Sequence, residues 1–118
     1  MVTASLSAYT YLDGFAGDRG IPFGGNSVQH GSAVFDAIRC YRTARGPALF
    51  RLREHVERLL YSAQTLGIEH EYSFRAVLAT VADAASASGL ADCYVRPVIF
   101  ARDPYLGVNL KAFRFTLG

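Results

Sequence analysis

Hydrophobic residues alternate with polar ones in two segments, residues 33–41 and 93–101, and this period predicts two strands. In the first strand, one face carries Val34, Asp36, Ile38 and Cys40, and the other carries Phe35, Ala37, Arg39 and Tyr41. In the second strand, one face carries Tyr94, Arg96, Val98 and Phe100, and the other carries Cys93, Val95, Pro97, Ile99 and Ala101. Because proline has no backbone N–H, we expect the second strand to be bulged, irregular or at a sheet edge there.

A helical period of apolar residues predicts two helices, over 54–66 and from Ser73 to about residue 88. The stripe of the first helix consists of Val56, Leu59, Leu60, Ala63 and Leu66, and that of the second consists of Phe74, Val77, Leu78, Val81 and Ala85. Gly67 and Gly89 follow the two stripes, as is common just after a helix ends. Ser73 is placed to cap the second helix.

Weaker signals predict shorter elements around these four. We expect short strands at 9–12, 21–23, 48–51 and 113–117, and one helical turn capped by Asn26 or Ser27 and ending towards Gly31. Helices and strands that do not alternate one for one predict an α+β fold, with a mostly antiparallel sheet flanked by two helices. A length of 118 residues predicts a single domain over residues 1–118.

Composition excludes several classes of protein. A hydrophobic fraction of 51% and a net charge of +2 argue against disorder. Two cysteines form no C-x-x-C motif, and the three histidines have no metal-ligand spacing, so we expect no metal. Without a long apolar run, a basic stripe or an evident signal peptide, we expect no membrane or nucleic-acid partner and a cytoplasmic location.

Arginine dominates the basic residues, with a single lysine at Lys111. Arginine favours bidentate contacts with phosphate or carboxylate. Tyr94 and Arg96 project from the same strand face about 7 Å apart and could hold a carboxylate, unless they are simply solvated surface residues. His30 lies in a loop before a strand, where a functional role is plausible, whereas His55 is expected at the surface. The residue pattern by itself predicts an α+β domain with an arginine-rich anion site.

Four segments taken together resemble a known family. Residues 30–41, HGSAVFDAIRCY, are similar to a Tyr-Gly step followed by Val-Phe-Glu-Gly-Ile-Arg-x-Tyr, and residues 50–68, 94–99 and 106–109 are similar to the next three blocks in order. These are marks of the small, N-terminal domain of class IV (fold type IV) aminotransferases, which use pyridoxal 5'-phosphate. Branched-chain amino acid aminotransferases are the most similar members, and D-amino acid aminotransferases and aminodeoxychorismate lyase are relatives.

The resemblance implies a role for several residues. Arg58 matches the arginine that binds the cofactor phosphate. Tyr94 and Arg96 match the pair that lines the substrate pocket and orients carboxylates, and Phe35 would shape an apolar side-chain site. Val108 matches a loop residue that family dimers insert into the neighbouring subunit's active site. His30 stands where branched-chain enzymes usually carry a pocket tyrosine, which puts the substrate preference in question. Arg39, on the strand beside the pocket, is expected to be structural.

The family's catalytic residues have no match in this chain. The Schiff-base lysine of the family belongs to a C-terminal large domain, which we expect to be absent from this chain, and Lys111 does not match it. We therefore expect no catalytic residue, an inactive isolated chain, and a partner, either a large domain or a second chain, that supplies the lysine. The complete enzyme, expected to be a homo-oligomer, would bind pyridoxal 5'-phosphate and move an amino group between a branched-chain amino acid and a 2-oxo acid.

Two alternatives remain open at this point. The chain could be a non-catalytic binding or assembly module that has kept the fold, or it could be part of an enzyme similar to aminodeoxychorismate lyase. Within the leading hypothesis, the chain could be a fragment, a truncation or one half of a split enzyme.

Overall fold

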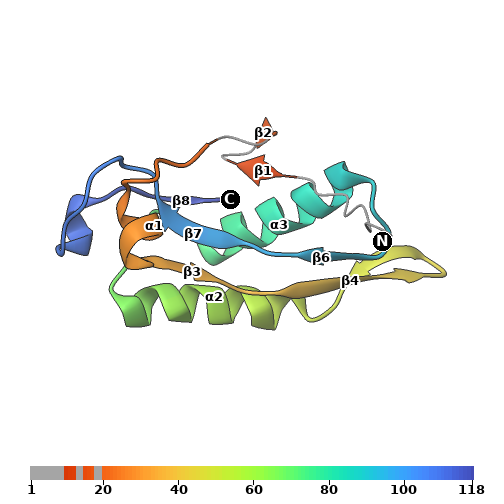
Figure 1. The fold of residues 1–118 in the computed structure, drawn as a ribbon. Helices are drawn as coiled ribbons and strands as arrows, with labels where there is room; N and C mark the ends of the chain where they lie inside the picture. The colour runs from red at the N-terminus through yellow and green to blue at the C-terminus, as the bar shows by residue number, and fades with distance from the viewer. Residues whose placement is uncertain (1–9, 13–14, 18–19) are drawn as a thin grey trace, which may run out of the picture.

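A computed structural model describes residues 10–12, 15–17 and 20–118, and its centre is a long antiparallel ribbon (Figure 1). One side of the ribbon is formed by β3 (Ala33–Phe35) and β4 (Ile38–Thr43). The other side is formed by β6 (Cys93–Val95) and β7 (Val98–Ala101). The fold is α+β, as the sequence predicts.

Each predicted long strand is interrupted in the middle, and Pro97 explains the interruption. The pairing of Phe35 with Val98 and of Ile38 with Val95 keeps one register across the gap. Asp36 N–H donates to Pro97 O at 3.2 Å, but Pro97 has no N–H to return the second bond of the pair. The ribbon is therefore continuous in register although its ladder is broken.

Two further strands widen the ribbon at opposite ends. β5 (Gly46–Leu49) returns from β4 through a hairpin, and β8 (Phe115–Leu117) pairs with β7. The resulting strand orders are β3-β7-β8 and β5-β4-β6, with every pair antiparallel. The hairpin between β4 and β5 lies at the end of the molecule opposite the helix α1 (Asn26–His30) and the short helix η1 (Leu110–Ala112) (Figure 1).

Two long helices contribute to the core beside the ribbon. α2 (Leu52–Leu66) begins two residues earlier than predicted and ends at Gly67, and α3 (Phe74–Ser88) is capped by Ser73 and ends at Gly89. The core joins apolar residues of both helices to the inward face of the strands, with Ile38, Val56, Leu59, Val77 and Ile99 among its members. Removing these side chains from water supplies the main driving force for this packing.

The N-terminal part differs from two predictions. The segment 21–23 is not a strand but leads into a turn, and it is followed by α1 (Asn26–His30). The N-cap of α1 is Gly25, which has no side chain to cap the helix. Asn26, one of the two predicted caps, is the first residue of α1, and its side chain donates to Gly107 O at 2.5 Å. β1 (Tyr11–Leu12) and β2 (Phe15–Ala16) form a short hairpin. Tyr9, the predicted start of the first strand, lies outside the described residues.

Candidate functional site

The outward face of the ribbon brings together four residues singled out in the sequence. Phe35, Arg39, Tyr94 and Arg96 are all exposed, and Phe35 shares a strand face with Arg39 and Tyr94 with Arg96, as the alternation predicts. Arg39 and Tyr94 are direct cross-strand partners. The guanidinium carbon of Arg96 lies 3.7 Å from the centre of the Phe35 ring, a close cation–π contact. This face therefore presents two guanidiniums, a phenol and an aromatic ring to one surface.

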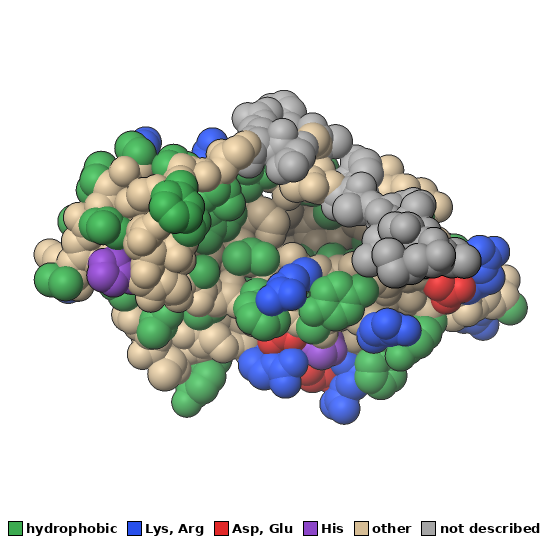
Figure 2. Space-filling view, viewed as in Figure 1, with side chains coloured by type: hydrophobic (Ala, Val, Ile, Leu, Met, Phe, Trp, Pro, Cys, Tyr) green, Lys and Arg blue, Asp and Glu red, His purple; other side chains and the backbone are tan. Residues whose placement is uncertain are grey.

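Asp36, next in the chain after Phe35, points to the opposite face and meets α2. Its side chain is 3% exposed, and its two carboxylate oxygens accept hydrogen bonds from Arg58 Nε at 2.7 Å and Arg58 Nη2 at 2.9 Å. His55 Nδ1 lies 2.8 Å from Asp36 Oδ1. Figure 2 shows basic side chains around acidic ones and a histidine over the region that β4 and α2 occupy in Figure 1. A buried acid thus anchors an arginine that is itself 64% exposed.

The electrostatics of this cluster keep Asp36 ionised. Burial raises the pKa of Asp36, but hydrogen bonds from Arg58, His55 and the Ala37 N–H lower it further, so that its pKa falls from 3.8 to about 2. The hydrogen bond and charge of Asp36 in turn raise the pKa of Arg58. The ion pair is therefore fully charged at neutral pH.

Arg96 and Arg58 are thus anchored to consecutive residues. Arg96 rests on Phe35, and Arg58 is held by Asp36. Because side chains alternate along a strand, these two anchors leave the chain on opposite faces. Each guanidinium can therefore offer N–H groups to an anionic group.

His30 and Val108 lie at the end of the molecule that carries α1. His30 is exposed in the last turn of α1, and the side chain of Val108 is 96% exposed in the loop after β7. The bond from Asn26 to Gly107 O ties α1 to that loop. Within the described part of the chain, no recorded hydrogen bond or ring contact joins His30 or Val108 to the guanidinium cluster.

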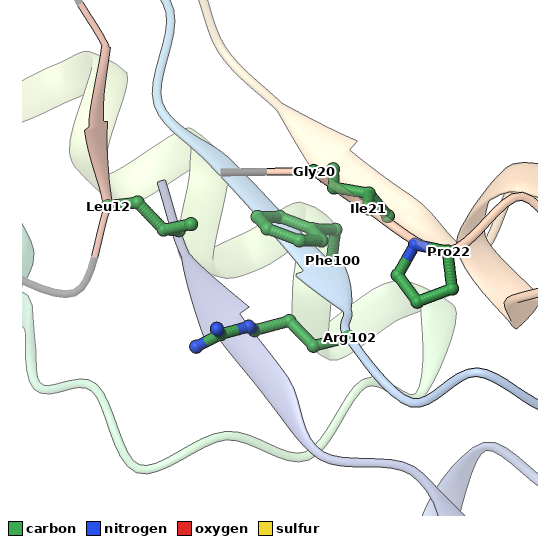
Figure 3. A pocket seen from close by; sticks show the side chains of 6 residues that line it. All are labelled: Leu12, Gly20, Ile21, Pro22, Phe100 and Arg102. Carbon is green, nitrogen blue, oxygen red and sulfur yellow. The ribbon is translucent and has the colours of Figure 1, made fainter. Parts of the chain in front are cut away.

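Two hollows lie near the N-terminal segment. A groove of about 960 Å³ runs between α3, β6 and β1, and it includes Tyr94 and Arg96 but neither Arg58 nor Phe35 in its lining. Figure 2 shows this face hollowed. A smaller cavity of about 220 Å³ lies between Phe100, Arg102 and the segment from Gly20 to Pro22, with Leu12 on its far side (Figure 3). The second cavity contains no predicted site residue.

Sequence reasoning did not single out Asp36 and His55 as members of the site. The available signal was Asp36 itself, which alternates with Val34, Ile38 and Cys40 on the buried face. A buried carboxylate requires a cationic or hydrogen-bonding partner, so this placement indicates an ion pair without saying which residue completes it. The sequence predicts the helix that carries His55 and Arg58, but only the tertiary structure shows that this helix packs against Asp36.

The described residues contain no group of three or more histidine, cysteine, aspartate or glutamate side chains that could hold a metal ion. No helix among the described residues is both long and apolar enough to cross a membrane.

Comparison with known proteins agrees with this fold. The family described as amino-transferase class IV matches residues 33–116, and the chain belongs to that family. The chain is 36% identical over 87 residues to the branched-chain-amino-acid aminotransferase of Escherichia coli K12, covering 74% of this chain. The corresponding Pseudomonas aeruginosa protein is 28% identical over 89 residues. The chain spans about 28% of the length of the Escherichia coli protein.

Solved structures show the same fold. The branched-chain aminotransferase of Thermoproteus uzoniensis with norvaline superposes with a TM-score of 0.85 at 29% identity, covering 92% of this chain and 38% of the other. A second branched-chain amino acid aminotransferase, from T.th. and complexed with N-(5'-phosphopyridoxyl)-L-glutamate, gives a TM-score of 0.86 at 28% identity, covering 95% and 39%.

Proposed function

We propose that this chain is the small-domain part of a pyridoxal-phosphate-dependent aminotransferase that moves an amino group between a branched-chain amino acid and a 2-oxo acid. The observation that supports this most directly is the anchoring of Arg58 and Arg96 on the adjacent residues Asp36 and Phe35. Membership of the family and the printed names of its relatives support the reaction class and the cofactor.

Arg58 fits the phosphate of the cofactor. Asp36 engages Nε and one hydrogen of Nη2, which leaves the outer edge of the guanidinium available, and the side chain is 64% exposed. A guanidinium fork suits phosphate oxygens bidentately. When bound, pyridoxal 5'-phosphate supplies an electron sink for carbanion chemistry. The contribution of Arg58 is to bind and orient the phosphate end.

Tyr94, Arg96 and Phe35 fit the two ends of a branched-chain amino acid. The Phe35 ring occupies one flat face of the Arg96 guanidinium, so the N–H groups at the edge of that guanidinium stay directed outward. Those N–H groups, with the Tyr94 hydroxyl, can bind a carboxylate. The half-exposed Phe35 ring offers apolar surface for an aliphatic side chain. We assign His30 to the pocket wall and Val108 to a contact with a neighbouring subunit.

The proposed enzyme requires a partner domain or chain that brings the reactive lysine. Lys111 is the single lysine of this chain, and its Nζ lies 3.6 Å from Glu69 Oε1 on an exposed surface. That position pairs the ammonium with a carboxylate and leaves both side chains in water. The chain alone then has residues that bind and orient, and no nucleophile for the cofactor.

The test measures cofactor binding and turnover separately. The isolated chain is expected to catalyse no transfer from valine to 2-oxoglutarate in the presence of pyridoxal 5'-phosphate. Titration followed by the ³¹P resonance of the cofactor should show binding that Arg58→Ala weakens. Arg42→Ala is the matched control, because Arg42 is another exposed arginine that pairs with an aspartate, Asp92, at a distance of 3.6 Å. Equal binding by both variants would contradict the role of Arg58, and turnover by the chain alone would contradict the need for a partner.

A further inference from the structure

We propose that Asp36, supported by His55, is a positioning residue that fixes the guanidinium of Arg58 with its outer edge directed at phosphate. This inference rests on the proposed role of Arg58 in binding phosphate. It adds that Asp36 restricts the Arg58 guanidinium to one orientation. Neither Asp36 nor His55 needs to touch the ligand for this role.

The geometry of the contact fixes the plane of the guanidinium. Arg58 Nε and Nη2 bond to different oxygens of Asp36, at 2.7 Å and 2.9 Å, which is the two-point fork arrangement. Two parallel bonds prevent rotation about the bond that carries the guanidinium. Of the three remaining N–H groups, one on Nη1 and one on Nη2 are parallel to each other, and they form the outer edge of the guanidinium. Arginine in this state offers a second two-point edge, as phosphate recognition requires.

Asp36 is itself held by several hydrogen bonds, so its contact with Arg58 fixes the guanidinium relative to the strands. Its backbone N–H donates to Pro97 O at 3.2 Å, and its Oδ1 accepts from the Ala37 N–H at 2.8 Å. His55, one helical turn before Arg58 on α2, contacts the same oxygen at 2.8 Å, and its Nδ1 lies 3.4 Å from Arg58 Nη2. The carboxylate is therefore fixed from the strand side and from the helix side.

The sign of one measurement separates positioning from a purely structural ion pair. Replacing Asp36 by asparagine removes a negative charge, which on Coulombic grounds alone would strengthen the attraction of Arg58 for an anion. If Asp36 is a positioning residue, the asparagine variant should instead bind phosphate more weakly. Without Asp36 the guanidinium of Arg58 rotates freely, and phosphate binding must then pay the entropy of ordering it. That entropy corresponds to about 0.5–1.5 kcal/mol for a long side chain, or roughly two- to tenfold in affinity.

The experiment follows the Arg58 Nε–Hε resonance of the 118-residue chain by ¹⁵N NMR during titration with inorganic phosphate. In the wild type this resonance should be sharp, slowly exchanging and shifted by phosphate. Asp36→Asn should broaden it and weaken phosphate binding about fivefold. His55→Ala should produce a smaller loss in the same direction, and it serves as the test if Asp36→Asn does not fold.

The matched control is Asp103→Asn. Asp103 is likewise a buried aspartate, 6% exposed at its side chain, that accepts from an exposed arginine, Arg114, at 3.3 Å. This variant should leave phosphate binding at Arg58 unchanged. Unchanged or tighter phosphate binding in Asp36→Asn and His55→Ala would overturn the positioning role while leaving the proposed function intact. If the chemical shift of Arg58 Nε–Hε in the wild type does not change on addition of phosphate, the proposed phosphate-binding role of Arg58 is wrong. The positioning role of Asp36 is then wrong as well.

Discussion

Asp36 combines two demands that are rarely met by one residue. It must be buried to lie on the inward face of the ribbon, and it must be charged to hold Arg58. Removing one member of a buried ion pair costs more than the pair contributes, because the remaining charge or polar group is left without a partner. The site is therefore coupled to folding stability through this single carboxylate.

The lowered pKa of Asp36 predicts that the free energy of unfolding decreases as the pH falls. A carboxyl group with a folded-state pKa of about 2, against 3.8 as the ordinary value, stabilises the fold above pH 4. That contribution, on the order of 2 kcal/mol, is lost as the pH falls from about 4 towards 2. Urea unfolding of the wild type and of Asp36→Asn should show a difference in the free energy of unfolding that is large at about pH 6 and shrinks at about pH 2.5.

Asp92→Asn is the control for that prediction. Asp92 also pairs with an arginine, but its side chain is 65% exposed, and an exposed pair contributes about 0–1 kcal/mol. Its difference from the wild type should be small at both pH values. A difference for Asp36→Asn that does not depend on pH would show that the carboxyl charge is not what stabilises the fold.

At the scale of elements, α1 is positioned by a close approach of two loops. The Gly25 backbone lies so near the loop after β7 that an added Cβ would meet Asp103 O at 2.8 Å and Pro22 O at 3.1 Å. The turn before α1 and the loop that carries Val108 are thereby packed against each other. This contact places His30 and Val108 at the same end of the molecule.

Gly25→Ala should consequently destabilise the protein, although its backbone conformation, with φ of −73°, is open to any residue. Overpacking of this kind costs about 1–3 kcal/mol, which chemical denaturation measures directly. Gly24→Ala is the neighbouring control, because its Cβ would meet only Pro104 O at an ordinary 3.7 Å. Equal stability of the two variants would mean that the loops separate at little cost.

At the scale of the whole molecule, apolar side chains are exposed at the end that carries α1 and η1. Phe23 is 81% exposed and Val108 96%, and Tyr105 and Leu106 are half exposed close to Val108 in the sequence. Exposed apolar side chains gathered at one end of a molecule are typical of interaction sites. It agrees with the proposal that this domain contacts a partner domain or subunit near the substrate pocket.

Val108→Asp should separate assembly from folding. Since the Val108 side chain is almost entirely in water, the free energy of unfolding of the isolated chain should change by less than about 0.5 kcal/mol. Sedimentation at increasing concentration should show weaker association than in the wild type. Tyr61→Asp, at an exposed apolar position on α2, should leave association unchanged. Association unaffected by Val108→Asp would place the interface elsewhere.

The sequence by itself determined the local structure and the faces of the ribbon. Alternation placed Phe35 and Asp36 on opposite faces of one strand and Arg96 on the same face as Tyr94, and the missing N–H of Pro97 predicted the irregularity of its strand. These inferences hold because a period of two and the absence of a donor are properties of the chain over a few residues.

Only the tertiary structure decided which distant residues complete the site. Nothing in the spacing of Asp36 and Arg58, which are 22 residues apart, indicates that they share two hydrogen bonds. The same holds for Arg96 and Phe35, whose contact depends on the register between β3 and β7. Such pairings arise when strands align and α2 packs on the ribbon, since burial of the core fixes the relative positions of elements that the local sequence leaves free.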